Sequence, residues 1–269
     1  MKDGIDFMAA PAIDVHGHCG EYGGFNEEMA RLMNASAAEV ERRAAACKIR
    51  LTIVSELSAF DLSPEETVDV DVANARAQAA VSDLDEVLFY AVVNPKLEGW
   101  EEKTEQLLTH PKCAGVKLHP RWNYWSVEEN GDRLFGFLSD RKVLTLTHTG
   151  NAGNEPGRFI PFANKYTGMK LILAHIGHDE VTDKRDLQIR AVQESTQGNV
   201  WADTSSFRSI CSRLIEFACA EIGPERMLFG TDTPLYFTAM HKARVAYADI
   251  DDKAKQLILH DNAAALLEA

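Results

Sequence analysis

The run Ala12–His18 predicts a strand that ends in two histidines, His16 and His18, separated by one residue. Side chains alternate between the two faces of a strand, so both imidazoles can reach the same point in space. Neutral imidazole binds zinc, manganese, iron and nickel. The pair is therefore a candidate for half of a metal site, although an isolated His-x-His is also typical of polar residues near a turn.

Four later apolar runs also end in residues that bind metals or move protons. In chain order these residues are Lys117 with His119, then His148, His175 and Asp232. If the runs are parallel strands of one sheet, their carboxyl ends meet at one rim, beside the His-x-His pair. Several imidazoles and a carboxylate on one rim predict a site for a divalent metal ion.

Eight short apolar runs predict the strands that position these residues, and longer Ala-, Glu- and Arg-rich runs between them predict helices. The predicted strands are Ala12–His18, Lys48–Glu56, Val87–Pro95, Cys113–Pro120, Val143–Gly150, Lys170–Gly177, Val200–Ser206 and Met227–Pro234. Eight strand–helix units in 269 residues predict an α/β fold, a (β/α)8 TIM barrel, as a single domain over residues 1–269. A doubly wound open sheet is the alternative, but no strong Gly-rich phosphate loop follows the first strand.

Strand alternation also predicts which side chains face the inside of the barrel. It places Leu144, Leu146 and His148 on the inner face of their strand, and it places Leu173 on the same face as His175.

Composition excludes several classes of partner. The net charge is −13 and no cluster of Lys or Arg stands out, which argues against binding to nucleic acid. No stretch approaches 18 uninterrupted apolar residues and no signal sequence is recognisable, so we expect a cytoplasmic protein without a membrane partner. Five scattered cysteines, with no Cys-x-x-Cys spacing, argue against a disulfide framework or a zinc ribbon.

Five motifs in order resemble the amidohydrolase superfamily. They are the His-x-His at 16–18, Gly-Val-Lys-Leu-His-Pro at 115–120, Thr-His-Thr-Gly at 147–150, Ala-His-Ile-Gly at 174–177 and Gly-Thr-Asp-Thr-Pro at 230–234. The closer similarity is to the amidohydrolase-2 branch, which includes aminocarboxymuconate-semialdehyde decarboxylase. The resemblance covers essentially the whole chain.

The resemblance implies one divalent metal ion held by His16, His18, His148 and Asp232. Zinc is the favoured ion, with manganese, iron or nickel as alternatives. In that scheme His175 is a catalytic acid/base or an electrophile beside the metal, and Asp232 also takes or returns a proton. An open position on such a metal can lower the pKa of bound water to about 7.

Lys117 leaves two arrangements open. In binuclear relatives a lysine on the fourth strand is carboxylated and bridges two metals, whereas the Gly-x-Lys-x-His-Pro context resembles the one-metal branch, which we favour. We expect Lys117, His119, Arg121 and Trp122 to bind substrate. A His119 satisfied by backbone groups and an Arg121 that forms only a surface salt bridge are the alternatives.

The first functional hypothesis is a hydrolase that uses metal-activated water on an amide, ester or lactone of a small anionic substrate. The alternative is a metal-dependent, non-oxidative decarboxylase of an unsaturated or aromatic carboxylate. The same residues serve both reactions. A binding module without catalysis is disfavoured because all the ligand-type residues are present. The resemblance also implies a homodimer.

Overall fold

Eight parallel strands form one sheet in the order β1-β2-β3-β4-β5-β6-β7-β8 in the computed structural model, which describes residues 5–60 and 69–268. The strands are β1 Ala12–Cys19, β2 Ile49–Glu56, β3 Val87–Val92, β4 Cys113–Leu118, β5 Leu144–Thr147, β6 Lys170–Leu173, β7 Val200–Asp203 and β8 Met227–Leu228. The α-helices are α1 Glu27–Met33, α2 Ala37–Ala46, α3 Val70–Val81, α4 Trp100–Leu108, α5 Val127–Asp140, α6 Ile160–Lys165, α7 Leu187–Glu194, α8 Leu214–Ile222, α9 Thr238–Ala246, α10 Asp252–Gln256 and α11 Asn262–Glu268.

The first and last strands meet through backbone hydrogen bonds just beyond β8. The Asp232 amide donates to the His16 carbonyl at 2.7 Å, and the His18 amide donates to the Thr233 carbonyl at 2.6 Å. Gly17 and Thr233 form a parallel bridge at the same point. These contacts nearly close the sheet into a barrel, so the predicted (β/α)8 fold is confirmed.

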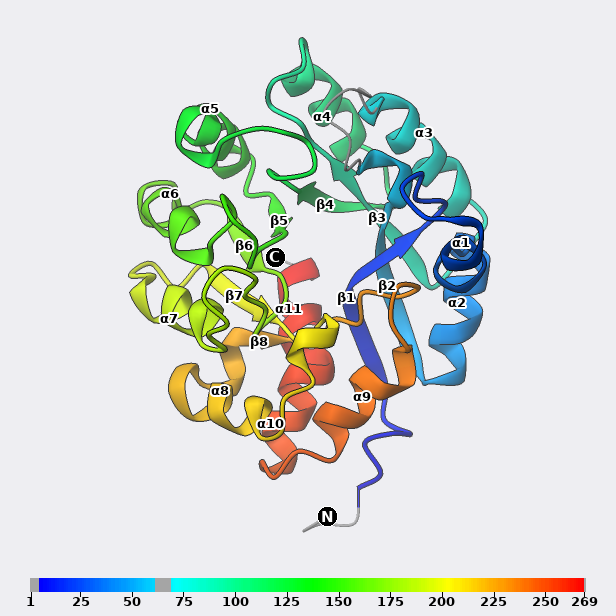
Figure 1. The fold of residues 1–269 in the computed structure, drawn as a ribbon, viewed down its shortest axis with the longest axis vertical. Coiled ribbons are helices and arrows are strands. Elements are labelled where there is room, and N and C mark those ends of the chain that lie inside the picture. Colours follow the sequence, from blue (N-terminus) through cyan, green and yellow to red (C-terminus); the bar gives the residue numbers. More distant parts are fainter. Residues whose placement is uncertain (1–4, 61–68, 269) are drawn as a thin grey trace.

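The helices surround the strands in chain order, from α1 and α2 beside β1 and β2 to α8 near β8 (Figure 1). Apolar strand residues that face outward pack with these helices in the largest core cluster. A second cluster fills the inside of the barrel, and the last helix, α11, contributes Ala263, Leu266 and Leu267 to it. Among residues 5–60 and 69–268, no helix is both long and apolar enough to cross a membrane.

The inner cluster tests the alternation prediction. Leu144 and Leu146 lie inside the barrel as predicted. Leu173 instead packs on the helix side, while Ile172 and Ala174 face inward. The prediction that Leu173 and His175 share a face is wrong, because His175 has a left-handed backbone with φ of 71°, which breaks the alternation where the strand ends.

A buried lysine joins three separate segments near the N-terminus. Lys242 on α9 is fully buried, and its Nζ donates to the carbonyls of Met8, Ala10 and Cys47 at 3.1, 2.6 and 2.7 Å. The three carbonyls satisfy all three ammonium donors, so this side chain anchors the N-terminal segment and the end of α2 to α9.

We expect Lys242→Met to destabilise the fold by about 3 kcal/mol, because three buried carbonyls lose their donor. Urea unfolding followed by circular dichroism measures this change. Lys253→Met, at an exposed position on α10, is the matched control and should change the free energy of unfolding by less than about 0.5 kcal/mol. Equal stability of the two variants would show that Lys242 does not tie these segments together.

Candidate metal and active site

Three of the predicted ligands converge where β1 meets the segment after β8. His18 Nε2 lies 3.0 Å from Asp232 Oδ1, and His16 Nε2 lies 3.5 Å from the same oxygen. All three side chains are buried, and their ligand atoms lie within 4.8 Å of one another. Two imidazole nitrogens and a carboxylate oxygen form a donor set that suits zinc, manganese or iron.

A second layer of hydrogen bonds orients the two imidazoles. His16 Nδ1 donates to Asp203 Oδ2 at 2.8 Å, so in the neutral ring Nε2 carries the lone pair. That lone pair accepts a hydrogen bond from Lys117 Nζ at 2.7 Å. Ser55 Oγ lies 2.9 Å from His18 Nδ1 and holds the second ring. A carboxylate behind a histidine is the usual support for a metal-binding imidazole, so these residues fit a divalent ion.

His148 lies beside this group rather than within it. Its Nδ1 is 3.1 Å from His175 Nε2, and its Nε2 contacts Asn151 Oδ1. The structure thus brings together three of the four ligands that the resemblance implies, and it places the fourth against His175. A second cluster of side chains that could hold a metal ion consists of His175, His16 and Asp203.

His175 contacts two of the candidate metal ligands, His16 and Asp232, and also lines the cavity. Its Nδ1 lies 2.8 Å from Ser205 Oγ and 4.0 Å from Asp232 Oδ2. Its backbone amide donates to Asp203 Oδ1 at 3.0 Å. Burial, with His148 and His16 nearby, lowers the pKa of His175 well below its usual value. The ring is therefore held in place by Ser205, just beyond β7, at one nitrogen and by His148 at the other.

Charges in this buried group depend on one another. Burial alone would raise the pKa of Asp232, but His16, His18 and Lys117 hold it well below its usual range. Burial lowers the pKa of Lys117 to about 8, against the opposing effect of Asp232 and Asp203. The site is a cation–anion cluster in which each charge needs its neighbours.

A cavity of about 140 Å³ opens above these residues. Apolar and aromatic side chains form much of its wall: Leu57, Phe60, Trp122, Phe207 and Leu235. The rings of His119 and Trp122 are stacked with centroids 4.4 Å apart. A cavity of about 150 Å³ with apolar walls accommodates benzene, so this cavity suits a substrate with one ring.

The predicted substrate residues differ in position. Lys117, His119 and Trp122 line the cavity, whereas Arg121 does not. The Arg121 guanidinium is exposed and pairs with Glu180 Oε2 at 3.2 Å. Glu180 itself lines the cavity, so Arg121 contacts a residue of the cavity wall.

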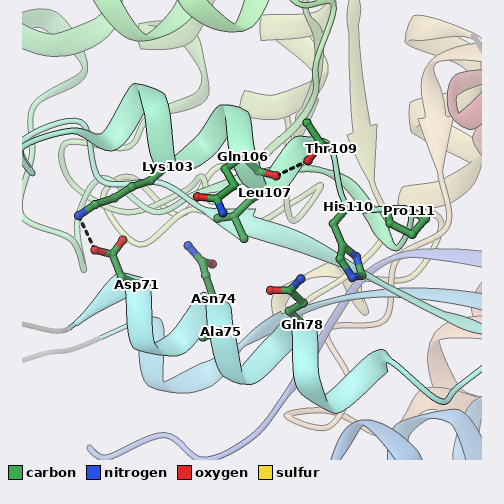
Figure 2. A pocket seen from close by; sticks show the side chains of 10 residues that line it. All are labelled: Asp71, Asn74, Ala75, Gln78, Lys103, Gln106, Leu107, Thr109, His110 and Pro111. Carbon is green, nitrogen blue, oxygen red and sulfur yellow. Dashed lines mark hydrogen bonds and ion pairs between the residues drawn. The ribbon is translucent and has the colours of Figure 1, made fainter.

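A separate hollow of about 520 Å³ lies between α3 and α4 on the outside of the barrel (Figure 2). Several of its polar side chains are paired with other groups of the protein: Lys103 Nζ lies 2.5 Å from Asp71 Oδ2. Asn74 Nδ2 donates to the Val92 carbonyl at 2.9 Å. Among the described residues, the two clusters of side chains that could hold a metal ion both lie at the barrel rim, away from this groove between α3 and α4.

The sequence model of the family described as amidohydrolase matches residues 13–269. The chain belongs to this family, in its amidohydrolase-2 branch. No curated protein matches the chain in sequence.

Solved structures of low sequence identity share the barrel of this amidohydrolase. One is 2,6-dihydroxybenzoate decarboxylase from Rhizobium, with a TM-score of 0.71, 14% identity and coverage of 96% of this chain and 98% of that one. Another is dihydroxybenzoic acid decarboxylase from Polaromonas with bound manganese and the inhibitor 2-nitroresorcinol. Its TM-score is 0.73 at 16% identity, and the match covers 96% of this chain and 97% of that one. A third is 5-carboxyvanillate decarboxylase from Novosphingobium aromaticivorans, complexed with manganese. Its TM-score is 0.76 at 11% identity, and the match covers 97% of this chain and 97% of that one.

Sequence reasoning missed the residues that support the ligands of this amidohydrolase. Strand alternation alone does not decide whether Asp203 or Thr204 faces the inside of the barrel. Asp203 lies at the end of β7 and accepts hydrogen bonds from His16 and from the amides of His175 and Ser205. The available signal was its place at a strand end on the same rim as the other ligands.

We expect Asp203→Asn to weaken metal binding by about tenfold or more, because the charge that fixes His16 is lost. Competition with a metal chelator on purified protein measures the affinity. Asp140→Asn, at the exposed end of α5, is the control and should leave affinity unchanged. Equal affinities of wild type and Asp203→Asn would refute the support that we assign to Asp203.

Proposed function

We propose that this amidohydrolase is a metal-dependent, non-oxidative decarboxylase of a small aromatic or unsaturated carboxylate. The observation that carries the proposal is the cavity of about 140 Å³, which aromatic rings line together with Lys117, His175 and Asp232. It offers apolar walls for one ring and a charged end for a carboxylate.

His16, His18 and Asp232 would hold the metal ion, with His148 and His175 beside it. A bound divalent cation would supply a Lewis acid that orients the carboxylate and offsets its charge. Lys117 adds a buried ammonium group at the same end of the cavity, which favours an anionic substrate. Phe60 and Trp122 exclude water from the ring and fix its plane.

Decarboxylation breaks the bond between the ring carbon and the carboxylate, releases carbon dioxide and leaves an electron pair that a proton must take up. Asp232 and His175 both border the cavity, and either can pass to the carbon a proton that it first takes up from solvent, because its low pKa leaves it without a spare proton at rest. The 3.1 Å contact between His148 Nδ1 and His175 Nε2 allows a proton to move between the two rings. Each turnover thus exchanges one carboxylate for one hydrogen on the substrate.

The solved relatives support this choice over hydrolysis. The Rhizobium, Polaromonas and Novosphingobium structures are decarboxylases of single-ring acids, and two of them are complexed with manganese. Manganese is therefore as suitable an ion to test as zinc.

Hydrolysis of an amide, ester or lactone is the second candidate. The observation that favours it is the position of Lys117, which is buried against the candidate metal ligand His16. Burial lowers the pKa of Lys117 to about 8. A carboxylated Lys117 could bridge two metal ions, as in binuclear relatives. Metal analysis separates the two arrangements, since one ion per chain fits the decarboxylase site and two fit the bridged one.

A direct test compares two substrate panels on manganese-loaded protein. Release of carbon dioxide from hydroxybenzoates, abolished by a chelator and restored by added metal, is the expected result. Cleavage of lactones, esters or aryl amides without release of carbon dioxide would contradict the decarboxylase and support the hydrolase.

We expect His175→Asn to lower kcat by roughly 100-fold or more while the metal content stays at the wild-type value, because the variant loses a proton donor and no primary ligand. Stopped-flow or steady-state assays of carbon dioxide release, with elemental analysis of the same samples, measure both quantities. His260→Asn, outside the cavity, should match wild type in each. Full activity of His175→Asn would exclude His175 from the proton transfer.

A further inference from the structure

Two histidines in the cavity wall have a buried Nε2 without a hydrogen bond, and of these His178 lies 3.6 Å from the Glu180 carboxylate whereas His119 faces no carboxylate among the described residues. His119 follows β4 and is only 2% exposed, and its Nε2 is a buried atom with no hydrogen bond among the described residues. The ring lines the cavity. Buried polar atoms in folded proteins are nearly always paired, so an unpaired one in a cavity wall indicates a place for a ligand atom.

The other ring nitrogen of His119 fixes which atom carries the proton. The backbone amide of Trp122 donates to His119 Nδ1 at 3.3 Å. An amide can only donate, so Nδ1 must be the acceptor. An imidazolium ring carries a hydrogen on both nitrogens, so a ring whose Nδ1 accepts a hydrogen bond is neutral. A neutral ring with a bare Nδ1 carries its hydrogen on Nε2, which makes Nε2 a donor.

Stacking prevents this ring from turning away. The His119 ring stacks on the Trp122 ring, with centroids 4.4 Å apart and planes 6° apart, and on the His148 ring, with centroids 4.0 Å apart and planes 14° apart. Trp122 in turn stacks on Tyr22 at 5.5 Å and 15°. A flip of the His119 ring would break the Trp122 hydrogen bond, so the Nε2–H donor has a fixed direction.

We propose that His119 Nε2–H donates a hydrogen bond to a second oxygen of the substrate, and that the enzyme thereby selects ring acids that carry a hydroxyl or oxo group besides the carboxylate. This inference rests on the proposed function, because Lys117 and the metal-type residues account for the carboxylate. An acid without the second oxygen would bury the donor unpaired and bind more weakly.

The first test uses benzoate and the 2-, 3- and 4-hydroxybenzoates as probes of manganese-loaded protein, with affinity measured by calorimetry. Wild type should bind at least one hydroxybenzoate about tenfold more tightly than benzoate. His119→Phe keeps a stacked ring but lacks the donor, so it should bind these acids within about twofold of one another. His260→Phe is the control and should keep the wild-type preference.

Retention of the full preference by His119→Phe, with wild-type metal content, would overturn the role of His119. Failure of every acid to bind either protein would count against the proposed function instead, and the second test then decides about His119.

That second test is independent of substrate. Nitrogen-15 NMR of the histidine rings in the metal-loaded protein, assigned by comparison with His119→Phe, reports which nitrogen bears the proton. A hydrogen on Nε2 of His119 supports the inference. A hydrogen on Nδ1 would overturn it whatever the acids do.

Discussion

Closure of the sheet between its first and last strands is the constraint on which the site depends. The hydrogen bonds of His16 with Asp232 and of His18 with Thr233 are backbone contacts, so they leave the imidazoles and the carboxylate free for other contacts. They place the two imidazoles of β1 directly against a carboxylate from the far end of the chain. The local sequence supplies either the two histidines of β1 or the aspartate after β8, and closure of the barrel brings them together.

Much of the fold could be predicted because it follows from short-range pattern. Strands covered on both faces are short, continuous apolar runs, and all eight runs form strands of the sheet. The same reasoning placed the ligand-type residues at one rim, since the carboxyl ends of parallel strands in a barrel face the same way. Residue type and strand position were therefore enough to indicate where a metal site would lie.

Alternation failed where the strands end and the functional residues begin. His175 and Asp232 both have left-handed backbones, with φ of 71° and 59°. A non-glycine residue in this region is strained and is held only by its surroundings, as when the His175 amide donates to Asp203. Such surroundings come from other strands, so no periodicity within one strand can predict them. The position of His148 against His175, and of Arg121 on Glu180, was likewise decided by contacts between loops.

With a divalent ion bound, the charge of the site would differ in sign from that of the whole molecule. A net charge of −13 would repel an anionic substrate, yet Lys117 and a divalent ion would make the end of the cavity cationic. Screening at physiological ionic strength limits the reach of surface charge to about 8 Å, so distant carboxylates act weakly on a ligand inside the barrel. Buried charges are screened much less, and Lys117 and the three ligand-type residues are all buried. Local charge therefore dominates inside the cavity, so the net charge of −13 does not by itself argue against an acidic substrate.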